Sequence, residues 1–216
     1  MNDALDAIAR STVAHYNDRA ESFFAGTIGH DVSQNIAAFL GALAAPAPLC
    51  LLDLGCGPGR DLKTLAALGH RAIGIDGADQ FVQMARHYSG CEVWQQEFLH
   101  LALPAAQFDG VYANASLFHV PRAALPAVLR KLYDALKAGG VLFSSNPRGD
   151  NQEGWSGERY GSYHDLAGWR AFMEEAGFLY LDHYYRPSGV PSSEQRWLAS
   201  VWRKPDRAVM LSGEQK

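Results

Sequence analysis

Cysteine is scarce in this sequence, with only Cys50, Cys56 and Cys91 among 216 residues. An odd number without C-x-x-C spacing does not supply the thiolate clusters of zinc sites or redox motifs. We therefore expect three reduced cysteines, mostly buried and without a catalytic or redox role, and no metal centre.

Long hydrophobic runs are also missing. No stretch of about 18 consecutive apolar residues occurs, which disfavours a membrane-spanning helix. The first residues, MNDALDAIARSTVAHYNDRAESFF, mix acids and Arg with apolar residues and lack the apolar centre of a signal peptide. These features predict a cytoplasmic protein.

An excess of positive charge is absent as well. The formal net charge is −4, which provides no general attraction to nucleic acid or anionic lipid. The content of 48% hydrophobic and 19% charged residues is that of an ordinary globular domain, and the length favours a single one.

Hydrophobic periodicity indicates a helical lead-in followed by alternating strands and helices. Helices are expected at 4–25 and 31–45, the second beginning after Asp31 and ending near Pro46 and Pro48. Short apolar runs at 49–54, 71–75, 91–95, 108–113 and 140–145 predict parallel strands, with crossover helices at 59–68, 78–88 and 121–138.

The last third differs in pattern. A polar, Gly-rich stretch continues to residue 163 and is expected to be a loop, followed by a helix at 164–176 and an antiparallel hairpin of 178–186 and 195–203. The predicted fold is a doubly wound, mostly parallel seven-stranded α/β sheet closed by that hairpin. It forms one domain, divided into a lead-in or lid (1–47), a cofactor-binding half (48–145), an acceptor-side region (146–204) and a tail (205–216).

The segment LLDLGCGPGRD joins the first strand directly to a helix through a glycine-rich turn. Such a turn exposes backbone N–H groups and the positive end of a helix to a ligand, and glycine tolerates the positive φ angles it requires. The glycines do not follow the dinucleotide spacing G-x-G-x-x-G, and Asp53 would repel a pyrophosphate. Asp53 suits a cationic group instead, and Asp76, at the end of the second strand, suits the hydroxyls of a ribose.

Four motifs in order resemble the class I S-adenosylmethionine-dependent methyltransferases: LLDLGCGPGRD, AIGIDGADQFVQMAR, FDGVYANASLFHVPR and LRKLYDALKAGGVLFSS. The resemblance implies S-adenosyl-L-methionine as cofactor. It assigns the methionine part to the turn of Asp53, Gly55, Cys56 and Gly57, and the ribose to Asp76. It also places Gly77 beside the adenosine, Glu97 at the adenine amino group with Gln96 or Phe98 against the ring, and Ala113 and Asn114 at the amino end and the sulfonium.

His119 and Tyr16 are the candidate catalytic residues. His119 follows the fourth strand and has an ordinary pKa that lets it accept a proton at neutral pH, or it is a structural histidine that satisfies a backbone group. Tyr16 lies in the lead-in helix that such enzymes fold over the cofactor, or it is a packing aromatic. A thiol, hydroxyl or protonated amine acceptor needs a base, whereas a carboxylate or phosphonate needs none.

The candidate acceptor-binding residues are Arg148, Arg159, Tyr160 and Tyr163, because arginine binds planar anions in a bidentate manner. The alternative is a solvated loop with incidental charges. Arg186 and Arg196 are either a surface pair or part of the same pocket, and Trp94, Trp169, Trp197 and Trp202 are read as core or strand-face residues.

The favoured function is methyl transfer to a small-molecule acceptor, an anionic one if these arginines bind it, by a monomer or homodimer. Three alternatives remain at this stage: a methyltransferase acting on tRNA or another nucleic acid, an NAD(P)-dependent oxidoreductase, and a binding protein of this fold without catalysis.

Overall fold

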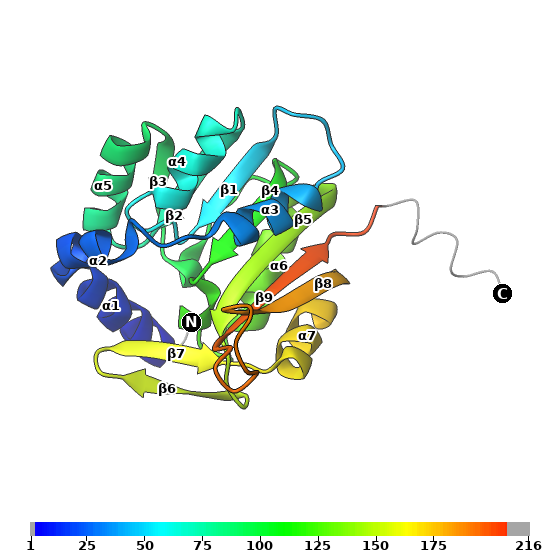
Figure 1. Ribbon diagram of the computed structural model, residues 1–216. Helices are drawn as coiled ribbons and strands as arrows, with labels where there is room; N and C mark the ends of the chain where they lie inside the picture. Colours follow the sequence, from blue (N-terminus) through cyan, green and yellow to red (C-terminus); the bar gives the residue numbers. More distant parts are fainter. Residues whose placement is uncertain (1–2, 207–216) are drawn as a thin grey trace.

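The computed structural model describes residues 3–206, and its main sheet has seven strands in the order β3-β2-β1-β4-β5-β9-β8 (Figure 1). The first five strands along the chain are parallel neighbours, and β9 runs antiparallel to both β5 and β8. The strands are β1 Cys50–Leu54, β2 Arg71–Asp76, β3 Glu92–Gln95, β4 Phe108–Asn114, β5 Leu136–Pro147, β8 Leu179–Arg186 and β9 Trp197–Arg203. The predicted fold class is confirmed.

Helices cover both faces of this sheet. Apolar residues of α3 (Ser33–Gly41), α4 (Arg60–Ala67) and α5 (Asp79–Ser89) pack in one buried cluster with Leu51. Residues of α6 (Leu125–Ala135) and α7 (Leu166–Glu175) pack in a second cluster with Leu52 and Leu54. Successive side chains of β1 therefore point to opposite faces, as a strand buried on both sides requires.

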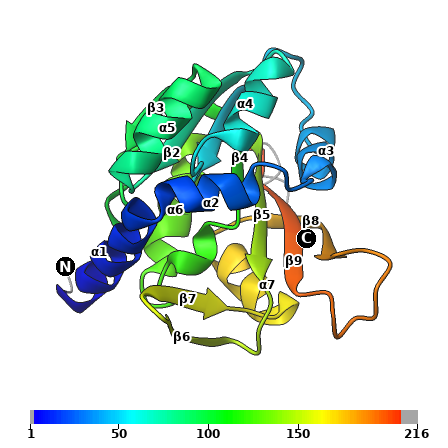
Figure 2. The ribbon, with the colours of Figure 1, turned by 60° about the vertical axis from the view of Figure 1, so that its left-hand side comes forward.

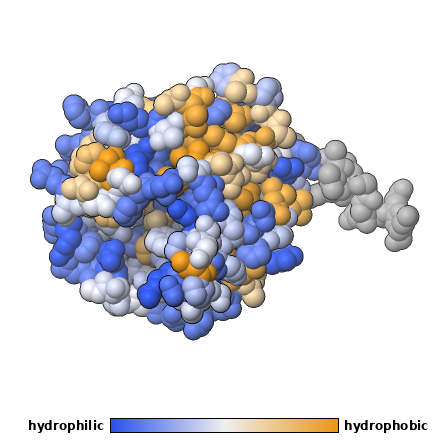
Figure 3. All heavy atoms as spheres, in the orientation of Figure 1, coloured by the Kyte–Doolittle hydropathy of each residue, from blue (hydrophilic) through white to orange (hydrophobic). Residues whose placement is uncertain are grey.

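The lead-in differs from its prediction. The expected single helix at 4–25 is two helices, α1 Asp3–Asp18 and α2 Ala20–Thr27, because Arg19 leaves the helical region with φ −118° and ψ 17°. The next helix begins two residues after Asp31, whose carboxylate accepts the Ser33 N–H at 2.9 Å, and it ends at Gly41, before the prolines. Beyond it, apolar residues gather on the surface over α3 and segment 42–49 (Figure 3).

The polar stretch after β5 is not a loop, which corrects the sequence prediction. It contains a separate two-stranded antiparallel sheet, β6 Gln152–Ser156 and β7 Arg159–Tyr163, which lies apart from the main sheet and beside α1 (Figures 1 and 2). Two further boundaries moved: the helix expected at 121–138 ends at Ala135, and β5 begins at Leu136, which is buried and pairs with Phe108.

Two remaining predictions concern cysteines and membrane spans. Cys56 is buried, Cys50 and Cys91 are half-buried, and all three are free. Within residues 3–206, no helix is long and apolar enough to cross a membrane. Of the predicted tail, residues 207–216 lie outside the described part of the chain, and the division into subregions stays a prediction.

Candidate active site

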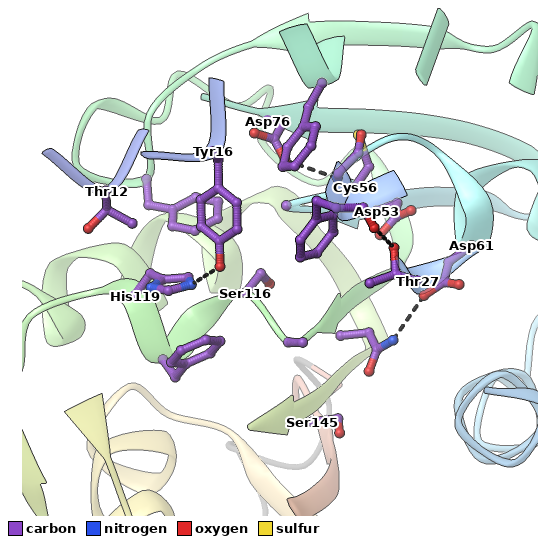
Figure 4. Close-up of a pocket in the computed structure, with 18 of the residues that line it drawn as sticks. Thr12, Tyr16, Thr27, Asp53, Cys56, Asp61, Asp76, Ser116, His119 and Ser145 are labelled. Atoms are coloured by element: carbon purple, nitrogen blue, oxygen red, sulfur yellow. Dashed lines mark hydrogen bonds between the residues drawn. The ribbon is translucent and has the colours of Figure 1, made fainter. Parts of the chain in front are cut away.

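A cavity of about 870 Å³ opens between the carboxyl edge of the sheet, the lead-in helices and β7. It lies beyond the ends of β1 and β4, where the strand order reverses. In open parallel sheets this switch point is where ligands bind, and the volume is within the roughly 300–1,000 Å³ of small-molecule sites. Figure 4 shows Tyr16 and His119 at one end, and Asp53 and Asp61 at the other.

The three glycines of the turn have positive φ angles of 72°, 53° and 94° at Gly55, Gly57 and Gly59. A Cβ on Gly55 would overlap the side chain of Ser116, and one on Gly59 would lie 2.8 Å from the Cα of Ala85 in α5. Gly55 and Gly59 thus allow close packing of the chain against itself. A Cβ on Gly57 would meet only Phe23, at 3.9 Å, so this position presents bare backbone to the cavity.

Asp53 is a buried acid that lacks a full set of partners. Its side chain lines the cavity, the residue is 2% exposed, and Oδ2 accepts no hydrogen bond from the described part of the chain. Burial, together with the nearby Asp61 carboxylate, raises the pKa of Asp53 well above its usual value. A cation bound here would supply the missing partner and lower that pKa.

Asp76 is held by backbone amides. Oδ2 accepts the Gly57 N–H and Oδ1 accepts the Ala78 N–H, both at 2.9 Å, so each carboxylate oxygen has a free lone pair. Burial raises the pKa of Asp76 to about 6, against the effect of these hydrogen bonds. The carboxylate is therefore fixed in place and can accept hydroxyl groups at neutral pH.

Asp61 and Arg60 were not singled out in the sequence, yet both line the cavity. Arg60 binds the Asp61 carboxylate through two hydrogen bonds, at 2.6 and 3.1 Å, and donates to the Thr27 carbonyl at 2.8 Å. Asn114 donates to Asp61 at 2.9 Å and accepts from Asn35 at 3.0 Å. Asn114 thus lies at the cavity as expected, with its amide engaged by protein groups.

Tyr16 and His119 form a hydrogen-bonded pair. Nδ1 of His119 lies 2.7 Å from the carbonyl oxygen of Tyr160, which can only accept, so Nδ1 carries the proton. Nε2 is then the acceptor, and the Tyr16 hydroxyl donates to it at 2.8 Å. Burial lowers the pKa of His119 to about 4, and Arg159 and His15 act in the same direction. Near neutral pH the imidazole is uncharged.

The helix that carries Tyr16 is fastened to the β6–β7 hairpin. Glu158 accepts from Arg19 at 2.8 Å and lies 3.1 Å from Nδ1 of His15, and Ser11 donates to its carbonyl. Two residues after Glu158, the Tyr160 N–H donates to the Thr12 hydroxyl at 3.2 Å. The hairpin therefore fixes the wall of the cavity that α1 supplies.

The structure brings most of the predicted site residues to this cavity. Lining it are Tyr16, Asp53, Gly55, Cys56, Gly57, Asp76, Glu97, Phe98, Asn114, His119 and Arg159. Burial raises the pKa of the Cys56 thiol, which keeps it protonated.

Several predicted residues lie elsewhere. Gly77 and Gln96 line a neighbouring depression of about 330 Å³; a Cβ on Gly77 would lie 3.1 Å from Val13 of α1, and the Gln96 amide bonds to the backbone of Ala102. Ala113 is fully buried in β4.

Three of the four candidate acceptor residues also lie outside the cavity. The guanidinium of Arg148 donates to the carbonyls of Ser192 and Gln195 and stacks on Tyr185. The Tyr160 ring contacts Trp155, and Tyr163 packs near Phe118. Among the lining residues that the sequence analysis did not single out, Arg60 and Asp61 belong to the glycine-rich motif, whereas Thr12 and Phe23 reach the cavity through tertiary packing. Arg186 lines the cavity, in agreement with one of its two predicted alternatives, and Trp197, expected in the core or on a strand face, lines it as well.

Comparison with known proteins gives a consistent result. Residues 51–140 match the protein-family profile described as a methyltransferase domain. Over 102 residues the chain is 35% identical to a trans-aconitate 2-methyltransferase of Azoarcus sp., covering 45% of this chain and 39% of the relative. Over 117 residues it is 35% identical to a 24-methylenesterol C-methyltransferase 2 of Oryza sativa, and this match covers 48% of this chain and 32% of the relative. The matched region spans less than half the length of these relatives.

Among solved structures, a 1,6-didemethyltoxoflavin-N1-methyltransferase of Burkholderia thailandensis, with 1,6-didemethyltoxoflavin and S-adenosylhomocysteine bound, superposes with a TM-score of 0.73. Its sequence identity is 21%, and the match covers 94% of this chain and 90% of that one. This likeness confirms the fold over nearly the whole chain.

Proposed function

We propose that this chain, which through residues 51–140 belongs to the class I S-adenosylmethionine-dependent methyltransferases, transfers a methyl group to a small-molecule acceptor. The observation that carries the proposal is the buried Asp53 oxygen without a partner, at the acidic end of a cavity whose other end holds Tyr16 and His119.

The residues present fit S-adenosylmethionine. Asp53 would hold the ammonium group, Asp76 the ribose hydroxyls, and the bare backbone at Gly57 would allow the chain to pass close by. Three carboxylates, those of Asp53, Asp61 and Asp76, face this end, and among the described residues only Arg60 is ion-paired to one of them. The excess of negative charge suits a ligand that carries positive groups.

When bound, the cofactor supplies an electrophilic methyl group on a sulfonium. The protein then has to position the acceptor and exclude water, and orientation alone is worth about 7–11 kcal/mol of a barrier. The aromatic side chains of Tyr16, Phe23 and Phe81 contact one another at ring distances of 5.2 to 5.6 Å. Together with Val13 they close the cavity on the side of α1.

Tyr16 and His119 are proposed to face the reacting atoms. The pair has a defined direction of donation, from the tyrosine hydroxyl to Nε2 and from Nδ1 to the Tyr160 carbonyl. A base role for His119 requires the Tyr16 hydroxyl to leave Nε2 first, and the low pKa makes the imidazole a weak base.

The volume of the cavity supports a small acceptor. The trans-aconitate and 24-methylenesterol relatives are named for small-molecule substrates of very different polarity, so their names do not select one acceptor. A cytoplasmic location, and a monomeric or homodimeric state, stay predictions.

The test is calorimetric titration with S-adenosylhomocysteine and, in parallel, with NADH. We expect binding of the first only, weakened at least about tenfold in Asp53→Asn. Asp134→Asn, which removes a carboxylate of an exposed helix pair, is the matched control and should bind normally. Stabilisation by NADH alone would overturn the proposal.

A further inference from the structure

We propose that the methyl acceptor is a small carboxylate with an apolar body, bound by Arg159 and methylated on its own carboxylate oxygen. The inference rests on the proposed function and names the substrate class of the same cavity. It follows from the position of Arg159, from the lack of an ion-pair partner for its guanidinium among residues 3–206, and from the hydrogen bonds already made by Tyr16 and His119.

Arg159 is held in place by its neighbours on both sides. Glu158 is bound by His15 of α1 and by Arg19, which directly follows α1, and the backbone of Tyr160 bonds to Thr12 and His119. Successive side chains of a strand point to opposite sides. The Tyr160 ring packs on the exposed Trp155, whereas Arg159 lines the cavity. The guanidinium is thus directed inward from a fixed backbone.

No carboxylate lies within ion-pair distance of the Arg159 guanidinium among residues 3–206. Burial raises the pKa of Tyr16, and the nearby Arg159 guanidinium opposes that effect. The other two arginines of the cavity donate hydrogen bonds to protein oxygens, although Arg186, like Arg159, has no carboxylate within ion-pair distance among residues 3–206. Arg60 is paired with Asp61, and Arg186 donates to the Asp31 carbonyl. A guanidinium has five N–H donors in a planar fork that matches a carboxylate. Arg159 therefore offers most of its donors to a ligand.

Charge separates the two ends of the cavity. The carboxylates of Asp53 and Asp61 lie at the end opposite the Tyr16–His119 pair, and Asp76 lies between them and nearer to Tyr16 (Figure 4). An anion is repelled from those three acids and attracted to Arg159. The same arrangement attracts the cationic groups of the methyl donor to the acidic end. The charges of the cavity therefore direct the donor and the anionic acceptor to different parts of it.

The hydrogen bonds around His119 leave no free base. Nδ1 donates to a carbonyl, Nε2 accepts from Tyr16, and the Tyr16 oxygen lies beside Arg159. This arrangement suits an acceptor that arrives without a proton to lose. A carboxylate oxygen uses a lone pair to bond the methyl carbon, and the carbon–sulfur bond breaks with its electron pair remaining on sulfur. The sulfonium becomes a neutral thioether, the carboxylate becomes a neutral methyl ester, and no proton moves.

The walls near this end are apolar. Ala9, Phe118, Val120 and Pro121 line the cavity together with His119. An acceptor that buries hydrocarbon there gains about 25 cal/mol per Å² of apolar surface. The neutral ester formed from it no longer pairs with Arg159, which favours release of the product.

The first experiment measures acid against amide. Benzoate and cinnamate, with benzamide and cinnamamide as neutral counterparts, are titrated by calorimetry into the protein saturated with S-adenosylhomocysteine. We expect the acids to bind about tenfold to 100-fold more tightly than the amides. Arg159→Gln should bring each acid and its amide within about twofold, and Arg148→Gln, the matched control outside the cavity, should keep the preference.

Binding of S-adenosylhomocysteine to Arg159→Gln is measured in the same series. Unchanged affinity shows that the variant is folded and that the cofactor end is intact, so failure of the carboxylate inference is distinguishable from failure of the proposed function. Equal binding of acids and amides, a preference that survives in Arg159→Gln, or no binding of either acid at millimolar concentration would overturn the inference.

The second experiment identifies the atom. The protein is incubated with S-adenosylmethionine labelled in the methyl group and a mixture of small aryl and alkyl carboxylic acids, phenols and amines. Methyl esters release volatile methanol in alkali, whereas methyl ethers and methylamines do not. We expect alkali-labile label from the acids, reduced at least about tenfold in Arg159→Gln. Label that stays stable in alkali assigns a phenol or an amine and contradicts the inference.

Discussion

The Tyr16 hydroxyl lies 2.8 Å from Nε2 of His119, although 103 positions separate the two residues in the chain. The bond ties the first helix to the loop after β4 across the mouth of the site. Since Nδ1 of the same ring is held by the Tyr160 carbonyl, the tautomer and the orientation of the imidazole are both fixed.

Replacing Tyr16 with Phe removes the donor that favours the neutral imidazole. We expect the pKa of His119 to rise from about 4 by up to about one unit. The unfolding free energy should fall by about 1 kcal/mol. NMR titration of the imidazole Cε1–H measures the pKa, and Tyr163→Phe, outside the cavity, is the control. A pKa unchanged by the substitution would show that the hydrogen bond does not form in solution.

Asp53→Asn should weaken cofactor binding without lowering the stability of the ligand-free protein. The ionised Asp53 carboxylate is buried with one oxygen unpaired, so its charge opposes folding. The variant is expected to melt at an equal or higher temperature without ligand, and to lose most of the stabilisation that S-adenosylhomocysteine gives the wild type. Thermal melts with and without ligand measure both effects. A variant that is both less stable and fully competent to bind would contradict this role.

The pKa of Asp76 predicts a pH dependence of cofactor binding. In the free protein the carboxylate ionises at about 6, and only the ionised form accepts a hydroxyl at both oxygens. Affinity for S-adenosylhomocysteine should fall about tenfold from pH 7 to pH 5. Asp76→Asn should bind weakly and lose this part of the pH dependence, as calorimetry at several pH values can show.

Asp76 also affects stability, with the opposite sign. Its pKa is higher in the folded than in the unfolded protein, so the folded state binds more protons between pH 4 and 6. Raising the pH through that interval therefore lowers the contribution of this group to the unfolding free energy of the ligand-free protein. Denaturant unfolding at matched pH values in the wild type and Asp76→Asn measures the difference.

Alanine substitutions separate the roles of the glycines. At Gly69 an added Cβ would meet open space, so Gly69→Ala introduces only the backbone strain of a φ of 88°. This strain should lower the unfolding free energy by about 1–2 kcal/mol. Gly55→Ala adds an overlap with Ser116 and should cost about 3 kcal/mol or more. Gly57→Ala should destabilise about as much as Gly69→Ala but weaken cofactor binding. Denaturant unfolding and calorimetry measure these effects; a Gly57 variant with normal affinity would remove that backbone from the site.

The order of the strands, and the positions of Asp53 and Asp76 beside the cavity, were predictable from local sequence. Continuous apolar runs such as 49–54 mark strands buried on both faces, and Asp53 and Asp76 follow directly from where β1 and β2 end. The positions of Asp53 and Asp76 depend on the pairing of neighbouring strands, and the local hydrophobic pattern of the sequence is enough to predict those strands.

The β6–β7 hairpin was not predictable in the same way. Its strands, QEGWS and RYGSY, contain few β-branched residues and no regular apolar alternation, because most of their side chains face solvent or α1. The break at Arg19 is likewise not marked by a proline or glycine in the sequence. Arg159 could be singled out by its charge, but only the folded hairpin distinguishes it from Arg148.

The contacts of Glu158 and Tyr160 with α1 connect segments more than 140 residues apart, whereas Asp53 and Asp76 come from two adjoining strands and Gly57 from the turn after the first of them. The residues proposed to bind the methyl donor therefore lie in one short segment of the chain, from β1 to β2. The residues proposed to bind the acceptor depend on the contact between two distant segments, α1 and the β6–β7 hairpin. Substitutions in the hairpin can therefore change which acceptor is methylated without changing the residues that bind the donor. This makes β6–β7 the first segment to redesign for a new substrate.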